Sequence, residues 1–219
     1  MQYIIFNTNG LKSNMVSELD IRNVTIEQDA YKFNQSRNVI LMTPYKPWDF
    51  QTKDFIIEYD IRIDNIYGEH AIFHSEGGTG IGLGIMLSIK NNKAYYLWHI
   101  RSTRTGTWDS NIMGNVYNDS NPRGNETNEI PNFVMGEFNN LKFTRKGNVF
   151  SIYCNRQLIV EQEMDINIKI GNQYSRIGVG AWINSVSNPE ITLYGYIKKF
   201  KLLINPINMI YSDLAVGGN

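Results

Sequence analysis

Alternate positions of one segment bring together side chains that could do acid–base chemistry. Residues 55–64 alternate apolar and polar types, so every second side chain shares one face of a strand. The polar face carries Glu58, Asp60, Arg62 and Asp64. Two carboxyl groups about 5 to 5.5 Å apart are what retaining glycoside hydrolysis needs, but an arginine beside them lowers a carboxylate pKa. We expect a solvated face with cross-strand ion pairs.

The histidines and the cysteine are sparse. His70, His74 and His99 are the only histidines and fall on separate segments, whereas a zinc site needs three or four converging ligands. Cys154 lies inside an alternating segment and is expected in the core. The glycine-rich stretch 77–84 lacks the Lys-Ser/Thr ending of a phosphate loop. We assign no catalytic residue and no transition-metal site.

Calcium is the one metal that the sequence leaves open as a cofactor. Ca²⁺ collects about six to eight oxygen ligands, and irregular loops can supply them. The oxygen-bearing residues of one polar segment are Asp109, Asn111, Asp119, Asn121 and Glu126. Asn and Asp are also ordinary turn residues, and the spacing is not that of an EF-hand. Asp109, Asp119 and Glu126 therefore stand as weak calcium candidates only.

An aromatic and polar group suits carbohydrate recognition best. Sugar C–H faces stack on Trp or Tyr, while sugar hydroxyls pair with Asp, Asn and Arg. The expected ligand-binding residues are Trp108, Arg104, Asp109, Arg101, Tyr117 and Asn118. Trp98, His99, Trp182 and Asn184 are further members, although Trp98 and Trp182 also fit a core position. Trp108 sits among small polar residues and is the predicted stacking platform.

The elements that must position these groups are short strands. Period-2 alternation dominates, Gly, Asn and Asp separate the segments, and no long helical pattern occurs. The predicted strands are residues 55–64, 81–89, 94–100, 140–145, 149–154, 157–163, 175–182 and 195–204. Turns at 91–93 and 146–148 carry residues that tolerate positive φ, so each should close a hairpin. The fold class is all-β.

One segment interrupts this pattern. Residues 102–136 are rich in Gly, Asn, Asp, Ser, Thr and Pro, and we interpret them as a long polar excursion. Long loops in compact domains are often functional, so the binding site is expected there. We predict a single domain over residues 1–205 and a C-terminal tail over 206–219.

Composition narrows the partners and the compartment. The 219 residues contain 21 Lys and Arg against 21 Asp and Glu, so no net field favours nucleic acid or an anionic surface. A single cysteine excludes a disulfide scaffold. The N-terminus lacks the features of a signal peptide, and no apolar run reaches the roughly 20 residues of a membrane helix. An abundance of Asn, Ile, Lys and Tyr fits an A+T-rich genome.

The order of four motifs resembles the concanavalin A-like superfamily, especially laminin G-like and pentraxin-like sandwiches. The stretches are residues 30–34 with 55–62, 138–145 with 150–158, 176–180, and 193–201. Two departures stand out. Phe138 lies near the position of the family's tryptophan, and Arg156 replaces the glycine of its Asn-Gly turn. The resemblance implies a two-sheet antiparallel jelly-roll sandwich.

The same resemblance frames the function. Its members include lectins, receptor modules, glycoside hydrolases and bacteriophage adhesion or decoration domains, and in laminarinase-type enzymes a second Glu stands where this chain has Arg62. We expect a non-catalytic module that binds a glycan or cell-surface receptor as part of a phage particle or surface assembly. The alternatives are a structural virion protein packing through its sandwich and tail, and a divergent glycoside hydrolase. The expected location is a virion or extracellular surface, otherwise the cytoplasm, with other virion proteins as further partners, no membrane insertion, and an open oligomeric state.

Overall fold

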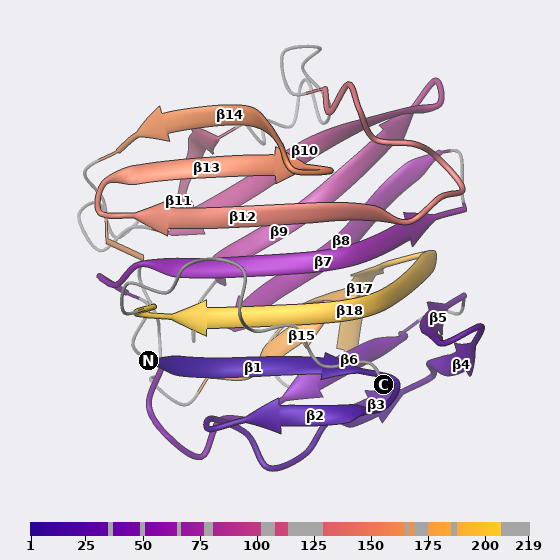
Figure 1. The fold of residues 1–219 in the computed structure, drawn as a ribbon, viewed down its shortest axis with the longest axis horizontal. Coiled ribbons are helices and arrows are strands. Elements are labelled where there is room, and N and C mark those ends of the chain that lie inside the picture. The colour runs from indigo at the N-terminus through magenta and orange to yellow at the C-terminus, as the bar shows by residue number, and fades with distance from the viewer. Residues whose placement is uncertain are drawn as a thin grey trace.

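The computed structural model describes residues 1–34, 37–48, 51–64, 67–76, 81–101, 108–113, 129–164, 167–168, 175–184 and 188–206. These residues form strands, turns and connecting segments arranged as two stacked sheets (Figure 1). No helix in this part of the chain has the length and apolar character to cross a membrane. The predicted all-β sandwich is confirmed.

A nine-stranded sheet forms the front layer in Figure 1. Its order is β14 (Gln157–Glu163), β13 (Val149–Cys154), β12 (Asn139–Lys146), β7 (Phe55–Ile63), β18 (Gly195–Ile204), β1 (Gln2–Asn7) and β2 (Gly10–Ser13). β5 (Ala30–Phe33) also pairs with β18, and β4 (Thr25–Glu27) pairs with β5. Every pairing in this sheet is antiparallel.

A seven-stranded sheet lies behind, with its strands running diagonally to those in front (Figure 1). Its order is β11 (Trp108–Met113), β10 (Lys93–Arg101), β9 (Ile81–Lys90), β8 (Gly68–Glu76), β15 (Ile177–Val179), β6 (Val39–Met42) and β3 (Asp20–Arg22). β16 (Ala181–Asn184) and β17 (Asn188–Thr192) form a separate hairpin that packs against β8.

The core lies between the two sheets, where the alternating side chains of both inner faces meet. In β7 the odd-numbered side chains from Phe55 to Ile63 are buried, as the sequence pattern predicts. Trp98 is almost fully buried and meets Phe55, Phe143 and Phe150 edge-on, at centroid distances of 6.4, 5.5 and 5.5 Å. Trp98 is therefore a core residue and cannot belong to a binding surface.

The hairpin turns follow the predicted chemistry. Asn91 and Asn92 have φ of 52° and 63° and join β9 to β10, while Gly147 has φ of 58° and joins β12 to β13. Asn155 and Arg156 have φ of 50° and 69° and join β13 to β14. The central hairpin thus survives the replacement of glycine by Arg156, which adopts the left-handed conformation that glycine favours.

The structure corrects two details of the predicted elements. The strand expected at 175–182 divides into β15 and β16 at Gly180, whose φ is 77° and where a Cβ would lie 2.2 Å from the Phe33 ring. The excursion expected at 102–136 contains the strand β11, and it ends in a turn that buries Ile130 and Phe133. Residues 102–107, 114–128 and 207–219 lie outside the described residues.

The hairpin β16–β17 covers part of the outer face of the seven-stranded sheet. Trp182 and Ile191 of the hairpin pack on Ala71, Met86 and Leu97 of the sheet. A second small cluster joins Ala181 and Ile183 to Val39 and Leu41 of β6. This explains why the rear sheet has apolar residues on both faces, as sheets covered on both sides do.

Candidate binding site at one end of the sandwich

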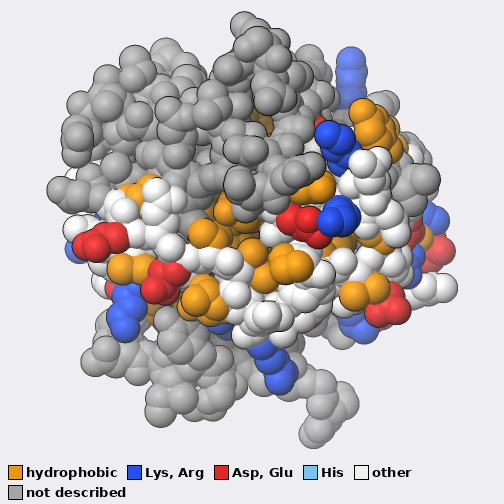
Figure 2. All heavy atoms as spheres, turned by 90° about the horizontal axis from the view of Figure 1, so that it is seen from above, with side chains coloured by type: hydrophobic (Ala, Val, Ile, Leu, Met, Phe, Trp, Pro, Cys, Tyr) orange, Lys and Arg blue, Asp and Glu red, His pale blue; other side chains and the backbone are white. Residues whose placement is uncertain are grey.

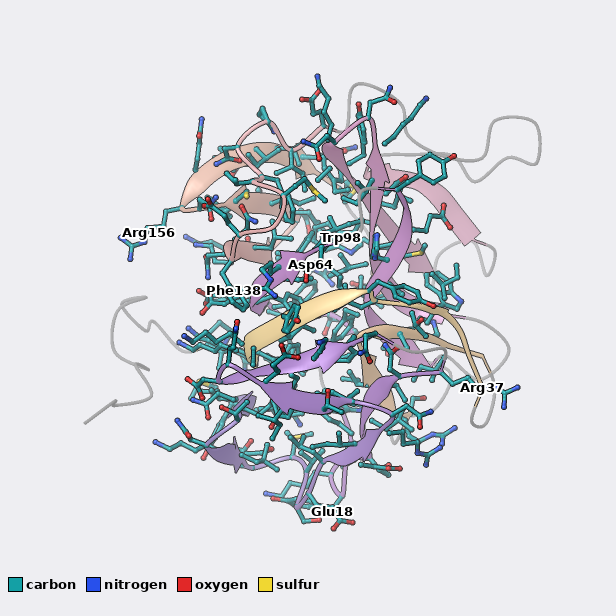
Figure 3. The ribbon with its side chains drawn as sticks, turned by 90° about the vertical axis from the view of Figure 1, so that its right-hand side faces the viewer. Glu18, Arg37, Asp64, Trp98, Phe138 and Arg156 are labelled. Atoms are coloured by element: carbon teal, nitrogen blue, oxygen red, sulfur yellow. The ribbon has the colours of Figure 1, made fainter. Side chains whose placement is uncertain are left out.

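Three chain segments distant in sequence meet at one end of the front sheet. β7 finishes there, while β12 and β18 begin there, because Asn139 pairs with Ile61 and Gly195 pairs with Ile63. Figure 3 looks onto this end, with Phe138 and Asp64 near its centre. Antiparallel pairing thus gathers side chains that no local sequence motif would group.

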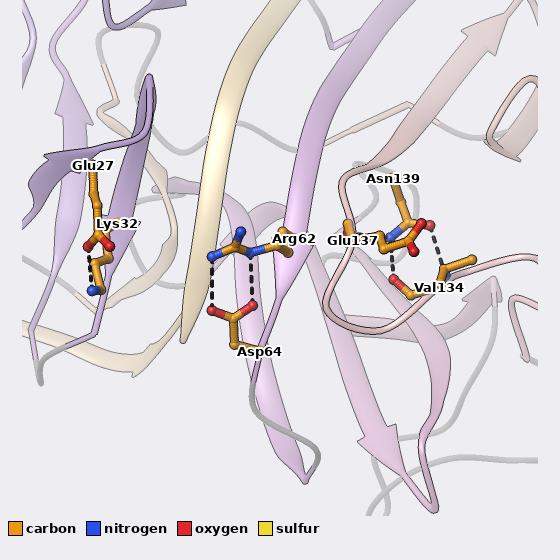
Figure 4. Close-up of polar contacts among 7 residues, drawn as sticks. All are labelled: Glu27, Lys32, Arg62, Asp64, Val134, Glu137 and Asn139. Carbon is orange, nitrogen blue, oxygen red and sulfur yellow. Dashed lines mark hydrogen bonds and ion pairs between the residues drawn. The ribbon is translucent and has the colours of Figure 1, made fainter.

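The arginine of β7 is held between two aromatic rings. The Arg62 guanidinium carbon lies 3.8 Å from the centre of the Tyr196 ring and 5.5 Å from that of Phe138. Its Nη2 donates to Asp64 Oδ2 at 3.2 Å, and its Nε forms an ion pair with Asp64 Oδ1 at 2.9 Å without hydrogen-bond geometry (Figure 4). We call Arg62, Asp64, Phe138 and Tyr196 the rim cluster.

A second ion pair borders the rim cluster. Lys32 of β5 pairs with Glu27 of β4 (Figure 4). Its Nζ lies 5.6 Å from the centre of the Tyr196 ring. The hydrogen bond to Glu27, and then the one to Tyr196, raises the pKa of Lys32. Arg62 and Lys32 are therefore each paired with a carboxylate, and they present oriented polar groups.

A buried asparagine holds the turn that carries Phe138. Asn139 Nδ2 donates to the carbonyl oxygens of Val134 and Glu137, at 2.8 and 2.9 Å, and its Oδ1 accepts from the Val134 N–H at 2.9 Å (Figure 4). Phe138 and Tyr194 keep 39% and 40% of their surface exposed. The cluster thus combines a rigid turn with exposed aromatic surface.

Close contact between β7 and β18 completes the site. A Cβ at Gly195 would lie 2.1 Å from the carbonyl oxygen of Arg62, so only glycine lets the two strands approach here. The next residue, Tyr196, is directly opposite Arg62 in the register. The Gly-x-Ile motif at 195–197 therefore positions the aromatic ring that stacks on the arginine.

Solved structures share this fold. The binding domain of botulinum neurotoxin serotype D is similar, with a TM-score of 0.59, 16% identity, and coverage of 92% of this chain and 46% of that chain. The serotype D ligand-binding domain in complex with N-acetylneuraminic acid has a TM-score of 0.55 and 14% identity, and the match covers 93% of this chain and 47% of that chain. The sialidase of Trypanosoma rangeli in complex with sialic acid has a TM-score of 0.54 and 15% identity, and the match covers 92% of this chain and 30% of that chain.

These likenesses establish the fold and not the function, because the identities are low. This chain spans less than half the length of each of these neighbours. No protein-family model matches the sequence, and no curated protein does. Membership of the concanavalin A-like superfamily stays a prediction beside the confirmed sandwich.

Of the residues that the sequence proposed for ligand binding, only Arg101, Trp108 and Asp109 have a described backbone position. Arg101 pairs with Trp108, and Ile100 pairs with Asp109, between β10 and β11. These two pairs lie at the C-terminal end of β10. The N-terminal end of β10, at Lys93, lies near Gly68, which follows the end of β7 in the chain. The side chains of Arg101, Trp108 and Asp109 are not among those described. Arg104, Tyr117, Asn118, Asp119 and Glu126 fall outside the described residues, as do the side chains of His99 and Asn184.

Trp182 packs against the rear sheet beneath the hairpin β16–β17. Its ring stacks on His74 with centroids 4.6 Å apart, and it packs into the small cluster beneath the hairpin β16–β17. Trp182 therefore covers the rear sheet. The sequence allowed a core position for it, and it packs in a small cluster outside the main core.

The charged face of β7 is an ion-pair network, as predicted. Glu58 pairs with Lys201 across β18 at 3.3 Å and accepts a hydrogen bond from Asn140 of β12 at 3.1 Å; Asn140 also donates to Asp60 at 2.9 Å. Burial raises the pKa of Glu58, but the Asn140 hydrogen bond and the Lys201 charge outweigh it, so the pKa is lowered. A carboxyl group of this kind remains ionised and is poorly suited to be a general acid.

Other candidates for chemistry take structural positions. Cys154 is buried, and burial raises its thiol pKa to about 12, so it is not an activated nucleophile. Within the described residues, no three or more His, Cys, Asp or Glu side chains converge as metal ligands. The calcium candidates remain untested predictions.

Seen from above, apolar side chains gather along the edge of the sandwich (Figure 2). β14 forms that edge of the front sheet, with Leu158 47% exposed and Ile159 and Val160 half-buried. A register shift against β13 and the exposed Glu161 and Glu163 interrupt it. Bulges and charges of this kind discourage strand addition, so we place no docking site there.

Proposed function

We propose that this chain is a non-catalytic module that binds a glycan or a receptor through the rim cluster. The observation that carries the proposal is the Arg62 guanidinium held between Tyr196 and Phe138, with Phe138 left partly exposed. Exposed aromatic rings beside fixed donors and acceptors suit a sugar, whose C–H face stacks while its hydroxyls form hydrogen bonds. Solved neighbours of the same fold include proteins bound to sialic acid and to rat synaptotagmin II.

The charge balance of the rim cluster favours neutral sugars over acidic ones. Arg62 is paired with Asp64 and Lys32 with Glu27, so a carboxylated sugar gains no free cation. Binding to neutral glycans should therefore change little with ionic strength, since screening acts on unbalanced charge.

A glycan array on the purified chain, run with and without EDTA, tests the function and the calcium alternative together. For the best glycan, Phe138→Ala should weaken binding at least about fivefold, by analogy with the roughly 1–3 kcal/mol of aromatic stacking on bases. Leu158→Ala is the matched control, because Leu158 is similarly exposed but lies on the β14 edge. Equal binding by wild type and Phe138→Ala would remove the rim cluster as the site.

The opposite end of the rear sheet is the second proposed location. Trp108, Arg104 and Asp109 retain their predicted roles as stacking platform and polar clamps, with Arg101, Tyr117 and Asn118 as neighbours. Since the two ends are separated by the length of the strands, single substitutions at Phe138 and at Trp108 distinguish them. A loss confined to Trp108→Ala would place the site beside β11.

The pairing of Glu58 with Lys201 and Asn140 supports the non-catalytic proposal over a divergent hydrolase. Release of reducing ends from β-glucans by the wild type, abolished in Glu58→Gln, would establish the hydrolase instead. The location on a phage particle or other surface assembly is also a proposal. Co-sedimentation of the chain with purified particles, and with the other particle proteins, tests it.

A further inference from the structure

Two buried histidines hold the same short segment of chain. His74 Nδ1 accepts a hydrogen bond from the Ile183 N–H at 3.0 Å, and His70 Nδ1 accepts one from the Tyr194 N–H at 3.2 Å. Their exposed fractions are 2% and 1%. Both histidines belong to β8, and both bonded amides lie in the segment from 183 to 194.

The two rings leave β8 on opposite faces. His70 pairs with Leu87, whose side chain is in the main core, whereas His74 pairs with Gly84 and stacks on Trp182 behind the rear sheet. A register shift between Ala71 and Phe73 separates them. β8 thus binds this segment through two histidines that lie on opposite faces of the sheet.

This segment is the hairpin β16–β17 with its junction to β18 (Figure 1). Its base is closed by the Leu193 N–H, which donates to the Gly180 carbonyl at 2.8 Å, and the Gly180 N–H donates to the Ile72 carbonyl at 3.2 Å. Beyond this base, the hydrogen bonds to His70 and His74 tie the segment to β8.

An imidazole whose Nδ1 accepts a hydrogen bond carries its single proton on Nε2 and is neutral. Protonation at Nδ1 turns that acceptor into a donor. Its new hydrogen then faces the hydrogen of the backbone N–H, and the hydrogen bond is lost. It also creates a cation inside the protein, at a large cost in solvation. Acid therefore weakens both bonds at once.

We propose that His70 and His74 form an acid-sensitive latch that holds the hairpin β16–β17 on the seven-stranded sheet. Opening the latch frees Trp182 and Ile191 from Ala71, Met86 and Leu97 and uncovers an apolar surface. Burial lowers the pKa of His70 to about 4, so the latch stays closed at neutral pH.

The ionisable neighbours come from the elements around β8. β8 itself contributes Glu69, β9 ends at Lys90, and β7 of the front sheet contributes Tyr59, whose hydroxyl donates to the Ile72 carbonyl. The described side chains of β10 include Tyr95 and Tyr96, while β6 and β15 contribute apolar residues and glycine only. Burial raises the pKa of Tyr96, so its hydroxyl stays neutral in acid. His70 and His74 are the histidines whose rings accept hydrogen bonds from the hairpin segment.

Amide hydrogen exchange of the wild-type chain, corrected for intrinsic rates at each pH, tests the latch. Protection of the Ile183 and Tyr194 amides should fall at least tenfold between pH 6 and pH 4. The Phe143 amide, in the middle of β12, reports global unfolding and should remain more strongly protected at pH 4 than these two amides. Unchanged protection at Ile183 and Tyr194, or protection at Phe143 that falls to the level of these two amides, would overturn the proposal.

Asparagine variants separate titration from packing, because the asparagine Oδ1 can accept a hydrogen bond near the position of Nδ1 but does not titrate. In His70→Asn and His74→Asn, the acid-dependent loss at the bonded amide should disappear. His99→Asn is the matched control and should keep the wild-type response. If a variant fails to fold, the wild-type exchange profile alone still decides the proposal.

Discussion

Phe138, Trp98 and Trp108 show how much the role of an aromatic residue depends on its neighbours. Trp98 is enclosed by three phenylalanine rings, whereas Phe138 covers Arg62 with one face and retains exposed surface. Burial of apolar area stabilises the first, and an available aromatic surface gives the second its potential for binding. Trp108 lies on the edge strand β11, and its role is the one that needs a direct test.

Trp108→Ala should weaken binding of the array-identified glycan at least about fivefold if the β11 end carries the site, with little change in Tm. Trp98→Ala, by contrast, should lower the free energy of unfolding by about 3–5 kcal/mol, since it opens a cavity in the core. Titration of glycan binding and thermal unfolding of both variants measure this. A large fall in Tm for Trp108→Ala with intact binding would make Trp108 structural.

At the scale of the elements, hairpins and close strand approaches set the geometry of the front sheet. β13 and β14 are joined through two residues in the left-handed conformation, one of them Arg156. β18 lies against β7 at Gly195 without room for a side chain. The turn between β13 and β14 accepts a non-glycine residue at positive φ despite its steric cost. The contact at Gly195 leaves no room even for a methyl group.

Arg156→Gly should stabilise the chain. A non-glycine residue in the left-handed region costs about 1 kcal/mol or more, and the greater freedom of glycine in the unfolded chain offsets part of the gain. We expect a net gain of roughly 0.5 kcal/mol and a Tm rise of about 1–2 °C by calorimetry. Arg156→Ala removes the same guanidinium but keeps a Cβ, so it should not stabilise; equal effects would assign the change to lost charge.

Gly195→Ala should destabilise strongly, because its Cβ would overlap the Arg62 carbonyl oxygen at 2.1 Å. Overpacking of this kind costs about 1–3 kcal/mol, which corresponds to a Tm fall of at least about 2 °C. Binding should weaken as well, since Tyr196 and Arg62 separate. Tyr194→Ala removes a larger neighbouring side chain without a clash, and its Tm should stay closer to wild type.

At the scale of the whole molecule, two sheets share one core while a hairpin seals part of the rear face. The chain carries no net charge at pH 7, so general repulsion is small there and individual buried groups begin the response to acid. His70 and Glu58 are largely buried groups of the described residues whose lowered pKa values make the folded state sensitive to acid.

Stability should fall as the pH is lowered. The folded-state pKa of His70 is about 4, below the roughly 6.5 of an unfolded chain, so unfolding takes up a proton in this range. The contribution is fully present above about pH 6.5 and is lost towards pH 4, amounting to about 3 kcal/mol. Glu58, with its lowered pKa, adds to the loss at the acid end. Denaturant unfolding at pH 7, 5.5 and 4 measures the slope, which His70→Asn should reduce; a stability independent of pH would contradict the assignment.

The sequence by itself determined several of the local elements. Alternation along residues 55–64, 149–154, 157–163 and 195–204 predicted strands that the structure confirms to within a residue. Asn91-Asn92 and Gly147 marked hairpin turns, because these residues relieve the steric cost of positive φ. The ion-pair face of Glu58 was also predictable, since period 2 assigns side chains to faces without knowledge of the partner strands.

Only the tertiary structure decided the rim cluster. Arg62 could be recognised as an interruption of a carboxylate pattern, but its aromatic partners Phe138 and Tyr196 come from segments far away in the chain. Their meeting depends on the register of β12 and β18 against β7, which inter-strand hydrogen bonds and core packing select jointly. Likewise, the hydrogen bonds of His70 and His74 exist only because the hairpin β16–β17 folds back on β8. Local pattern specifies which face a side chain takes, and long-range pairing specifies what it meets there.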